Sequence, residues 1–280
     1  MRVGIGLPNT VPGTPPDLLI RWAELADEGP WSSLGVLDRV PYESYEPMAL
    51  LAATAGVTSR IALVTMVITG PLRSDFVLAK EAATIHSFSG GRLTLGLGLG
   101  ARPEDYDRLG VARGGRGDRL DWQLAELRDA FENGSVGPAL NGGPDLLVGG
   151  GSDISLARAA RYADGYVHGG GPPRAFLRAA TRASAGWSEA GRPGDPQLWA
   201  QAYFALGDSD TVERGRAFMR DYYAFAGPFA EKIAAGLLTT RQSVVQFVRG
   251  YAEAGCDELV LLPAVAELEQ VDRLAQVVGA

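Results

Sequence analysis

The chain has 280 residues, of which 46% are apolar and 21% are charged, so it is long enough to bury one large hydrophobic core. Its formal net charge of −7 argues against binding to a nucleic acid or to an anionic membrane surface. The single cysteine, Cys256, excludes an internal disulfide, and two histidines are too few for a Cys/His zinc site, so we expect no metal. No segment approaches the roughly 20 apolar residues of a membrane span, and the N-terminus lacks a secretory signal pattern, which predicts a cytoplasmic protein.

Eight short runs rich in Val, Ile and Leu recur along the chain, and a longer stretch with helical periodicity follows each of them. The predicted strands cover residues 2–7, 33–37, 61–68, 93–99, 146–148, 165–168, 198–206 and 258–262. The predicted helices cover residues 15–28, 46–56, 75–88, 118–132, 155–163, 173–190, 211–225, 241–254 and 265–278. Gly29 and Pro30 follow the first helix, and Gly90 and Gly91 follow the third, as expected where a helix ends.

This alternation predicts parallel strands connected by helices, and eight such units in 280 residues predict a (β/α)8 TIM barrel of the α/β class. We expect a single domain over residues 1–280, because no linker-like or low-complexity segment divides the chain. Two longer segments, residues 101–117 and the segment between the seventh and eighth predicted strands, are expected to be insertion loops that cover a pocket at the C-terminal face.

The fifth predicted strand is followed by three glycines, Gly149, Gly150 and Gly151, and then by Ser152 and Asp153 at the start of a helix. Glycines let the backbone approach an anion closely, and the N–H groups and dipole of a helix N-terminus attract it, so this loop is a candidate phosphate site. A plain glycine turn with Ser152 or Asp153 as the helix N-cap is an equally good interpretation. The charge of Asp153 argues against bound phosphate unless its side chain turns away.

Two further strand ends on the same rim are rich in glycine. His168 ends the sixth predicted strand before three glycines, which could hold more of a ligand's phosphate or sugar, while a single histidine is more often structural than catalytic. Gly96, Gly98 and Gly100 alternate within the fourth predicted strand and lack the spacing and the helix start of a dinucleotide fingerprint. Glycines inside a strand leave space, so we expect room for a planar ring above the core, although barrel packing alone also explains them.

Two other strand ends carry candidate ligand contacts. Thr65, Met66 and Val67, in the third predicted strand, form either an apolar platform for a ligand or a part of the barrel core. Asp38 and Arg39 follow the second predicted strand, where an isolated buried carboxylate would be costly. This pair therefore either steers a ligand or forms a structural ion pair.

Four parts of the chain carry a resemblance to a known family: residues 3–8, residues 79–85 with 89–98, residues 148–152 with 159–166, and residues 254–261. The most specific features are Ser-Gly-Gly-Arg at 89–92, where the fourth predicted strand begins, and Ala-Asp-Gly at 163–165, where the sixth begins. With these segments the sequence resembles the bacterial luciferase-like family of flavin-dependent oxidoreductases over nearly the whole chain.

The resemblance implies a TIM barrel that binds reduced FMN, or the deazaflavin coenzyme F-420, with the ring over the barrel mouth. The cofactor-binding residues that it implies are Thr65, Met66, Val67, Gly98, Gly149, Gly150, Gly151 and Ser152. The first three form a bulge that backs the ring, which in many relatives contains a non-prolyl cis peptide. The glycine loop with Ser152 holds the phosphate.

The leading hypothesis is a monooxygenase that uses reduced FMN and oxygen on a small organic substrate, with a separate flavin reductase as partner. Many relatives that use coenzyme F-420 carry Asp-His after the second strand, whereas this chain has Asp38 and Arg39, which favours FMN. We predict that Asp38 and His168 are catalytic residues on the substrate side. Arg39 or Arg102 is predicted to bind phosphate or a substrate anion.

Three other functions stay open. A dehydrogenase or reductase that depends on coenzyme F-420 would transfer hydride without oxygen, and a non-catalytic protein would bind flavin without turnover. An unrelated phosphate-dependent barrel such as an aldolase needs a lysine nucleophile or an acid/base pair, and the only lysines, Lys80 and Lys232, fall in helical patterns. Relatives are often homodimers, so the resemblance also implies a homodimer.

Overall fold

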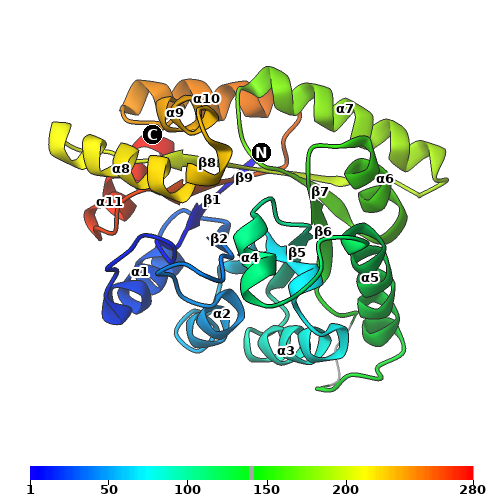
Figure 1. Cartoon of the computed structure of the whole chain (residues 1–280). Coiled ribbons are helices and arrows are strands. Elements are labelled where there is room, and N and C mark those ends of the chain that lie inside the picture. The colour runs from blue at the N-terminus through cyan, green and yellow to red at the C-terminus, as the bar shows by residue number, and fades with distance from the viewer. Residues whose placement is uncertain (139–141, 280) are drawn as a thin grey trace.

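The computed structural model describes residues 1–138 and 142–279, and its strands form one parallel sheet that closes into a barrel (Figure 1). The strand order is β3-β2-β1-β9-β8-β7-β6-β5-β4, and β3 also pairs with β5, which closes the ring. The strands are β1 (Arg2–Gly6), β2 (Ser33–Val36), β3 (Ala62–Thr65), β4 (Ile68–Thr69), β5 (Leu93–Gly98), β6 (Asp145–Gly149), β7 (Gly165–His168), β8 (Gln197–Phe204) and β9 (Glu258–Pro263). Because β3 and β4 both pair with β5 and are parts of one barrel strand, the predicted eight-stranded TIM barrel is confirmed.

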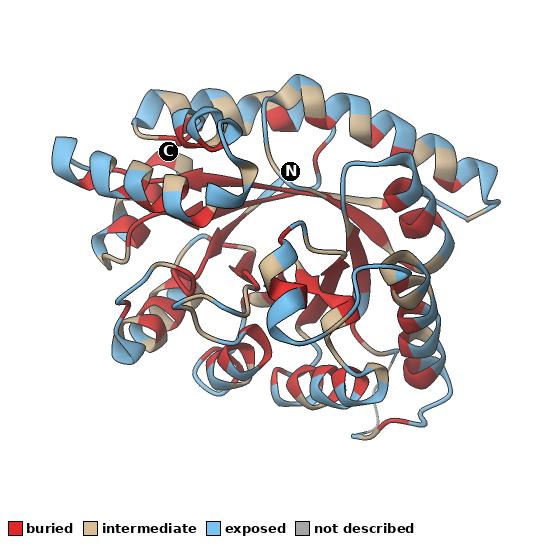
Figure 2. Cartoon of the chain, in the orientation of Figure 1, coloured by how far each residue is buried: buried red, intermediate tan, exposed pale blue. Residues whose placement is uncertain are grey.

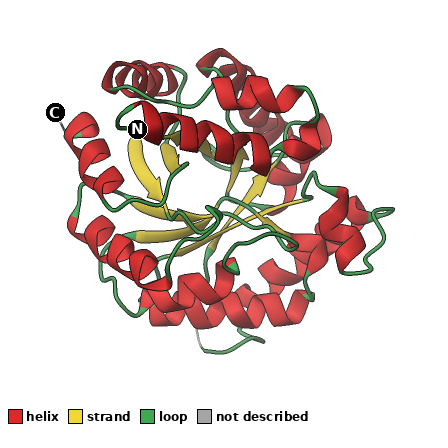
Figure 3. Ribbon diagram, turned by 60° about the vertical axis from the view of Figure 1, so that its left-hand side comes forward, coloured by secondary structure: helices red, strands yellow, loops and turns green. Residues whose placement is uncertain are grey.

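Helices surround the strands on the outside of the barrel (Figure 3). They are α1 (Pro16–Glu28), α2 (Pro47–Ala55), α3 (Asp75–Phe88), α4 (Pro103–Arg108), α5 (Arg116–Glu132), α6 (Asp153–Tyr162), α7 (Pro173–Glu189), α8 (Ser209–Tyr222), α9 (Phe229–Ala235), α10 (Arg241–Glu253) and α11 (Glu269–Val278). Proline occupies the first helical position of α1, α2, α4 and α7, where its missing N–H has no intrahelical partner to lose. None of the helices in residues 1–138 and 142–279 is long and apolar enough to pass through a membrane.

The buried apolar side chains form two clusters, one between the strands and the helices and one inside the barrel. Figure 2 shows the buried residues along the strands and on the helices around them. The outer cluster contains the strand residues that face the helices, such as Leu95 and Val148. The inner cluster contains the strand residues that alternate with them and face the barrel interior, such as Leu147, Val167 and Val260. The barrel interior is therefore a packed core, and space for a ligand remains only toward its ends.

The N-terminal end of the barrel is closed by Glu258, which is buried. Its carboxylate accepts hydrogen bonds from Arg2 Nε at 2.8 Å and from the hydroxyls of Ser33, at 2.5 Å, and Ser32. These charge-assisted hydrogen bonds satisfy an acid that would otherwise be costly inside the barrel. A ligand site is therefore expected at the opposite, C-terminal end.

Three expectations from the sequence are wrong in detail. Residues 61–68 do not form one continuous strand, because Met66 and Val67 bulge out of the ladder between β3 and β4, and the peptide bond between them is cis. Residues 101–117 are not a simple loop, because they contain α4 and the start of α5. The long connection after β8 contains α9 in addition to the two helices predicted there.

Candidate active site

Val67, in the bulge between β3 and β4, is seated against three glycines of the neighbouring strands. A Cβ atom on Gly98 would lie 2.8 Å from Val67 Cγ2, and one on Gly149 would lie 3.0 Å from the same atom. A Cβ on Gly96 would lie 2.9 Å from Val67 Cγ1 and 2.3 Å from the backbone oxygen of Thr65. The alternating glycines of β5 thus make room for the bulge itself, whereas the sequence suggested room for a planar ring.

The loop after β6 has a conformation that only glycine adopts easily. Gly150 has φ 149°, and a Cβ there would lie 2.7 Å from the Ser155 side chain. Ser152 caps α6: its hydroxyl accepts from the Ser155 N–H at 3.2 Å, and the Ser155 hydroxyl accepts from the Ser152 N–H at 3.0 Å. The Tyr166 hydroxyl donates to the Gly150 carbonyl at 2.6 Å and holds the loop against β7.

A cavity of about 330 Å³ lies between the bulge and this loop. It is lined by Met66, Val67, Gly98, residues 99–101, Gly149, Gly150, Gly151, Ser152, Ser155, Val167, Gly169 and Gln201. Seven of the eight residues predicted to bind the cofactor are in this lining. Thr65 is not, because its hydroxyl donates to the Gly96 carbonyl at 2.8 Å and accepts from the Gly96 N–H at 2.7 Å, which ties β3 to β5.

The phosphate loop is compatible with an anion. Within the described residues the N–H groups of Gly150 and Gly151 donate to no protein acceptor, and both precede the N-terminus of the ten-residue helix α6. The carboxylate of Asp153, which would repel a phosphate, pairs with Arg182 of α7. Among the described residues that line this cavity none has a charged side chain. Backbone N–H groups, the hydroxyls of Ser152 and Ser155 and the helix dipole are therefore the groups that would hold a phosphate.

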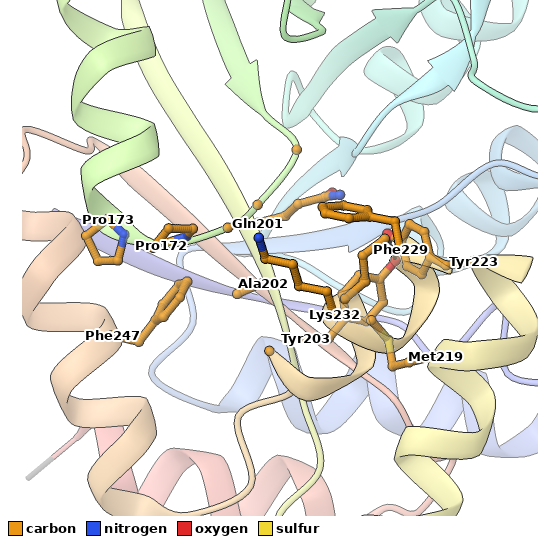
Figure 4. A pocket seen from close by; sticks show the side chains of 15 residues that line it. Pro172, Pro173, Gln201, Ala202, Tyr203, Met219, Tyr223, Phe229, Lys232 and Phe247 are labelled. Carbon is orange, nitrogen blue, oxygen red and sulfur yellow. Dashed lines mark hydrogen bonds between the residues drawn. The ribbon is translucent and has the colours of Figure 1, made fainter. Parts of the chain in front are cut away.

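A second cavity of about 540 Å³ adjoins the first and shares Gly169 and Gln201 with it. The loop after β7, strand β8 and helices α8, α9 and α10 form its walls (Figure 4). Most of its lining is apolar or aromatic, including Tyr203, Tyr223, Phe229 and Phe247. Neither this cavity nor Gln201 could be predicted from the sequence, because α9 and the residues of β8 come together only in the folded barrel.

Asp38, predicted to be catalytic, is buried at the end of β2 and lines neither cavity. Its carboxylate accepts hydrogen bonds from Arg73 Nη1 and Nη2, at 2.7 and 3.0 Å, and from the Thr69 N–H at 2.8 Å. The charge of Asp38 raises the pKa of Arg73 against the opposing effect of burial. Asp38 thus connects β2 to β4 immediately after the bulge, and its catalytic role stays a prediction.

Arg39 and Arg102, the predicted anion-binding residues, also line neither cavity. Both guanidinium groups donate to the Tyr222 carbonyl, at 3.3 and 3.2 Å. The Arg102 guanidinium lies 4.3 Å from the Tyr222 ring centre, and Arg39 pairs with Glu104 at 3.2 Å. Together they attach the segment with α4 to the end of α8.

His168, the other predicted catalytic residue, lies at the end of β7 and faces α7. Its ring packs edge-on against Phe176 with the ring centres 5.8 Å apart, and its Nδ1 is 3.3 Å from the Tyr166 hydroxyl. Burial lowers the pKa of His168, so the neutral ring is favoured in the folded chain. It is not among the residues that line either cavity, and its catalytic role stays a prediction.

Replacing His168 with glutamine is expected to reduce the loss of stability on acidification. Because the pKa is lowered in the folded state, the unfolded chain takes up a proton first as the pH falls below about 6.5, and the folded state loses stability from there downward. Unfolding in denaturant at about pH 7.5 and about pH 5.5 measures this difference. Burial also lowers the pKa of His86, so His86→Gln is a second variant with the same sign. An unchanged pH dependence in His168→Gln would contradict the placement of His168.

Comparison with known proteins gives a family. A family model described as luciferase-like monooxygenase matches residues 1–255. An uncharacterized protein of Mycobacterium tuberculosis is 35% identical over an alignment of 161 residues that covers 52% of this chain and 56% of the relative. Pyrimidine monooxygenase RutA of Escherichia coli is 30% identical over an alignment of 203 residues that covers 65% of this chain and 54% of the relative. The chain thus matches little more than half the length of these curated relatives.

Solved structures agree on the fold. A coenzyme F-420-dependent secondary alcohol dehydrogenase in complex with an F-420–acetone adduct superposes with a TM-score of 0.83 at 16% identity, over 99% of this chain and 97% of that one. The oxygenating constituent of 3,6-diketocamphane monooxygenase of Pseudomonas putida, in complex with FMN, superposes with a TM-score of 0.73 at 17% identity, over 99% and 95% of the two chains. From the family model and the closed barrel together, we conclude that this chain belongs to the luciferase-like monooxygenase family.

Proposed function

We propose that the protein is an oxidoreductase that binds reduced FMN in the 330 Å³ cavity and oxidises a small organic substrate with oxygen. The observation that carries this proposal is the position of the cavity between the bulge at Met66 and Val67 and the loop before α6. An apolar wall faces a loop with free N–H groups, which matches a ligand with a flat ring at one end and a phosphate at the other.

In this proposal FMN supplies the redox chemistry, and the chain supplies binding, orientation and exclusion of water. Gly150, Gly151 and Ser152 bind the phosphate through N–H and hydroxyl groups. Met66 and Val67 support one face of the ring. The apolar walls of the second cavity keep water from the reacting atoms and leave space for the substrate beside the ring.

The same site fits a second function, hydride transfer with coenzyme F-420. The deazaflavin has the same flat ring and phosphate-bearing side chain, and one solved neighbour is a secondary alcohol dehydrogenase that depends on it. Arg39 stands where many F-420-dependent relatives carry histidine, which favours FMN. We keep the dehydrogenase as the alternative, and a non-catalytic flavin-binding protein as the outcome if cofactor binds without turnover.

The test is a titration of the purified protein with oxidised FMN, reduced FMN and coenzyme F-420. Gly151→Asp places a carboxylate at the phosphate position and is expected to raise the dissociation constant at least tenfold, about 1.4 kcal/mol. Gly151→Ala is the matched control, because no atom lies within 4 Å of a Cβ at this position and φ is not in the left-handed region. The control is expected to bind like the wild type.

Preference for reduced FMN, with oxygen consumption that depends on substrate, would support the monooxygenase. Preference for coenzyme F-420 would support the dehydrogenase. If no cofactor binds, or if Gly151→Asp binds as the wild type does, the assignment of the loop is wrong. A separate flavin reductase, a homodimer, a cytoplasmic location and a single domain over residues 1–280 stay predictions.

A further inference from the structure

We propose that the second cavity binds a substrate with an apolar or aromatic body and an anionic group, and that Lys232 pairs with this anionic group. The proposal rests on the proposed function, since it assigns the 540 Å³ cavity to the substrate and the adjoining cavity to the cofactor. Its size is in the range of small-molecule sites, about 300–1,000 Å³.

Two apolar walls face each other across this cavity (Figure 4). Phe247 and the two prolines Pro172 and Pro173 form one wall, and Tyr223 and Phe229 belong to the other. Aromatic walls favour a flat or apolar ligand body, which gains free energy when it leaves water.

Lys232 is the charged residue of this lining. Its side chain extends from α9, and its ammonium group points between the two walls (Figure 4). Within residues 1–138 and 142–279 it makes no ion pair, and the adjacent Glu231 is paired with Arg220 at 2.8 Å. Its nitrogen lies 5.5 Å from the Phe229 ring centre. Lys232 itself is exposed, so its ammonium group can meet the carboxylate of a ligand whose apolar body lies between the walls.

The choice of lysine is itself unusual in this chain. Of its 26 cationic residues only Lys80 and Lys232 are lysines, and all others are arginines. A lysine has a flexible stem with a compact charge, which can follow ligands of different length, whereas a planar guanidinium favours one bidentate geometry.

Gln201 gives a second, independent sign of a ligand. It is 8% exposed, lies at the junction of the two cavities, and its Oε1 accepts no hydrogen bond within the described residues. A buried amide oxygen without a hydrogen-bond donor is costly, and a donor group of a bound substrate would remove this cost. Gln201 and Lys232 thus mark two ends of one substrate, with the Gln201 end next to the cofactor.

The experiment uses a matched pair of probes, 4-phenylbutyrate and 4-phenylbutan-1-ol, which share the aromatic body and differ in charge. Binding is measured by calorimetry on the wild type, on Lys232→Met and on Lys80→Met. Methionine is unbranched, only one atom shorter than lysine, uncharged, and favours helix. Lys80 lies outside both cavities, where it donates to the Gly137 carbonyl. We expect Lys232→Met to weaken binding of the acid about tenfold and to leave the alcohol unchanged, while Lys80→Met changes neither.

Isotope-labelled methyl groups on the two lysines give a direct readout of position. The resonance of Lys232 is expected to shift when 4-phenylbutyrate binds, and that of Lys80 is expected to stay in place. Equal binding of acid and alcohol to the wild type, or equal effects of the two lysine variants, would overturn the proposal. So would a loss of FMN or F-420 binding in Lys232→Met without a loss of probe binding, because the anion would then belong to the cofactor.

The two proposals fail separately. If neither cofactor binds but the acid still depends on Lys232, the anionic ligand site stands and the assignment of the first cavity falls. If a cofactor binds and the acid does not depend on Lys232, the first cavity stands and this inference falls.

Discussion

Replacing Gly98 with alanine is expected to lower the free energy of unfolding by about 1–3 kcal/mol, because the new methyl group would lie 2.8 Å from Val67 Cγ2. The clash is with one side chain, since the next atom, the Gly149 oxygen, is 3.6 Å away. The bulge at Val67 must then move, so cofactor affinity is expected to fall as well. Chemical denaturation and the FMN titration measure the two effects.

A double-mutant cycle separates this clash from a general loss of stability. Val67→Ala removes the methyl groups that the Gly98→Ala side chain meets, so the double variant is expected to be more stable than the sum of the single effects predicts, by about 1 kcal/mol or more. Gly96→Ala is expected to lower the free energy of unfolding more, by about 3 kcal/mol. Val67→Ala is not expected to restore this loss, because the new Cβ would lie 2.3 Å from the backbone oxygen of Thr65.

Gly186 is the matched control, since it lies inside helix α7 and a Cβ there would have no neighbouring atom within 4 Å. Gly186→Ala is expected to stabilise the protein by up to about 1 kcal/mol through helix propensity. If the effects of Gly98→Ala and Val67→Ala on the free energy of unfolding are strictly additive, Val67 does not pack against Gly98 as described.

These glycines show which part of the fold could be predicted from the sequence. The apolar runs and their spacing were sufficient for the eight-stranded barrel, because a parallel strand with helices outside and a core inside is apolar on both faces. The alternation of Gly96 and Gly98 could also be read from the sequence, but the side chain that packs against these glycines could not. Val67 is about thirty positions earlier in the chain, and only the register of β3 and β4 against β5 brings it to these glycines.

The candidate site also has one part that could be predicted from the sequence and one part that could not. The loop of Gly150, Gly151 and Ser152 is a local pattern, and a strand followed by glycines and a helix cap can be read directly from neighbouring residues. Gln201 and Lys232 come from β8 and α9 and meet only through tertiary packing. The charge pairs were equally hidden: Asp38 had Arg39 beside it in the sequence, whereas its partner in the structure is Arg73.

Replacing Asp38 with asparagine is expected to lower the free energy of unfolding by about 3 kcal/mol, because it leaves the partly buried Arg73 without its bidentate partner. Glu46, 3.0 Å from the Arg73 Nη2 that also contacts Asp38, is half exposed and offsets only a small part of this loss. The control is Glu104→Gln, because Glu104 is 41% exposed and Arg39 keeps its hydrogen bond to the Tyr222 carbonyl. There the same change of acid to amide is expected to lower the free energy of unfolding by less than about 1 kcal/mol.

The kinetic effect of Asp38→Asn separates positioning from catalysis. The Asp38 carboxylate accepts the Thr69 N–H just after the bulge, so its loss is expected to weaken cofactor binding while kcat at saturating cofactor changes little. The double variant Asp38→Ala/Arg73→Met removes both charges, so neither is left unpaired. Its loss in the free energy of unfolding is therefore expected to be smaller than the sum of the losses in the two single variants. A fall in kcat by orders of magnitude in a stable Asp38→Asn variant would instead support the catalytic role predicted from the sequence, since a group that touches the reacting atoms cannot be replaced by added cofactor.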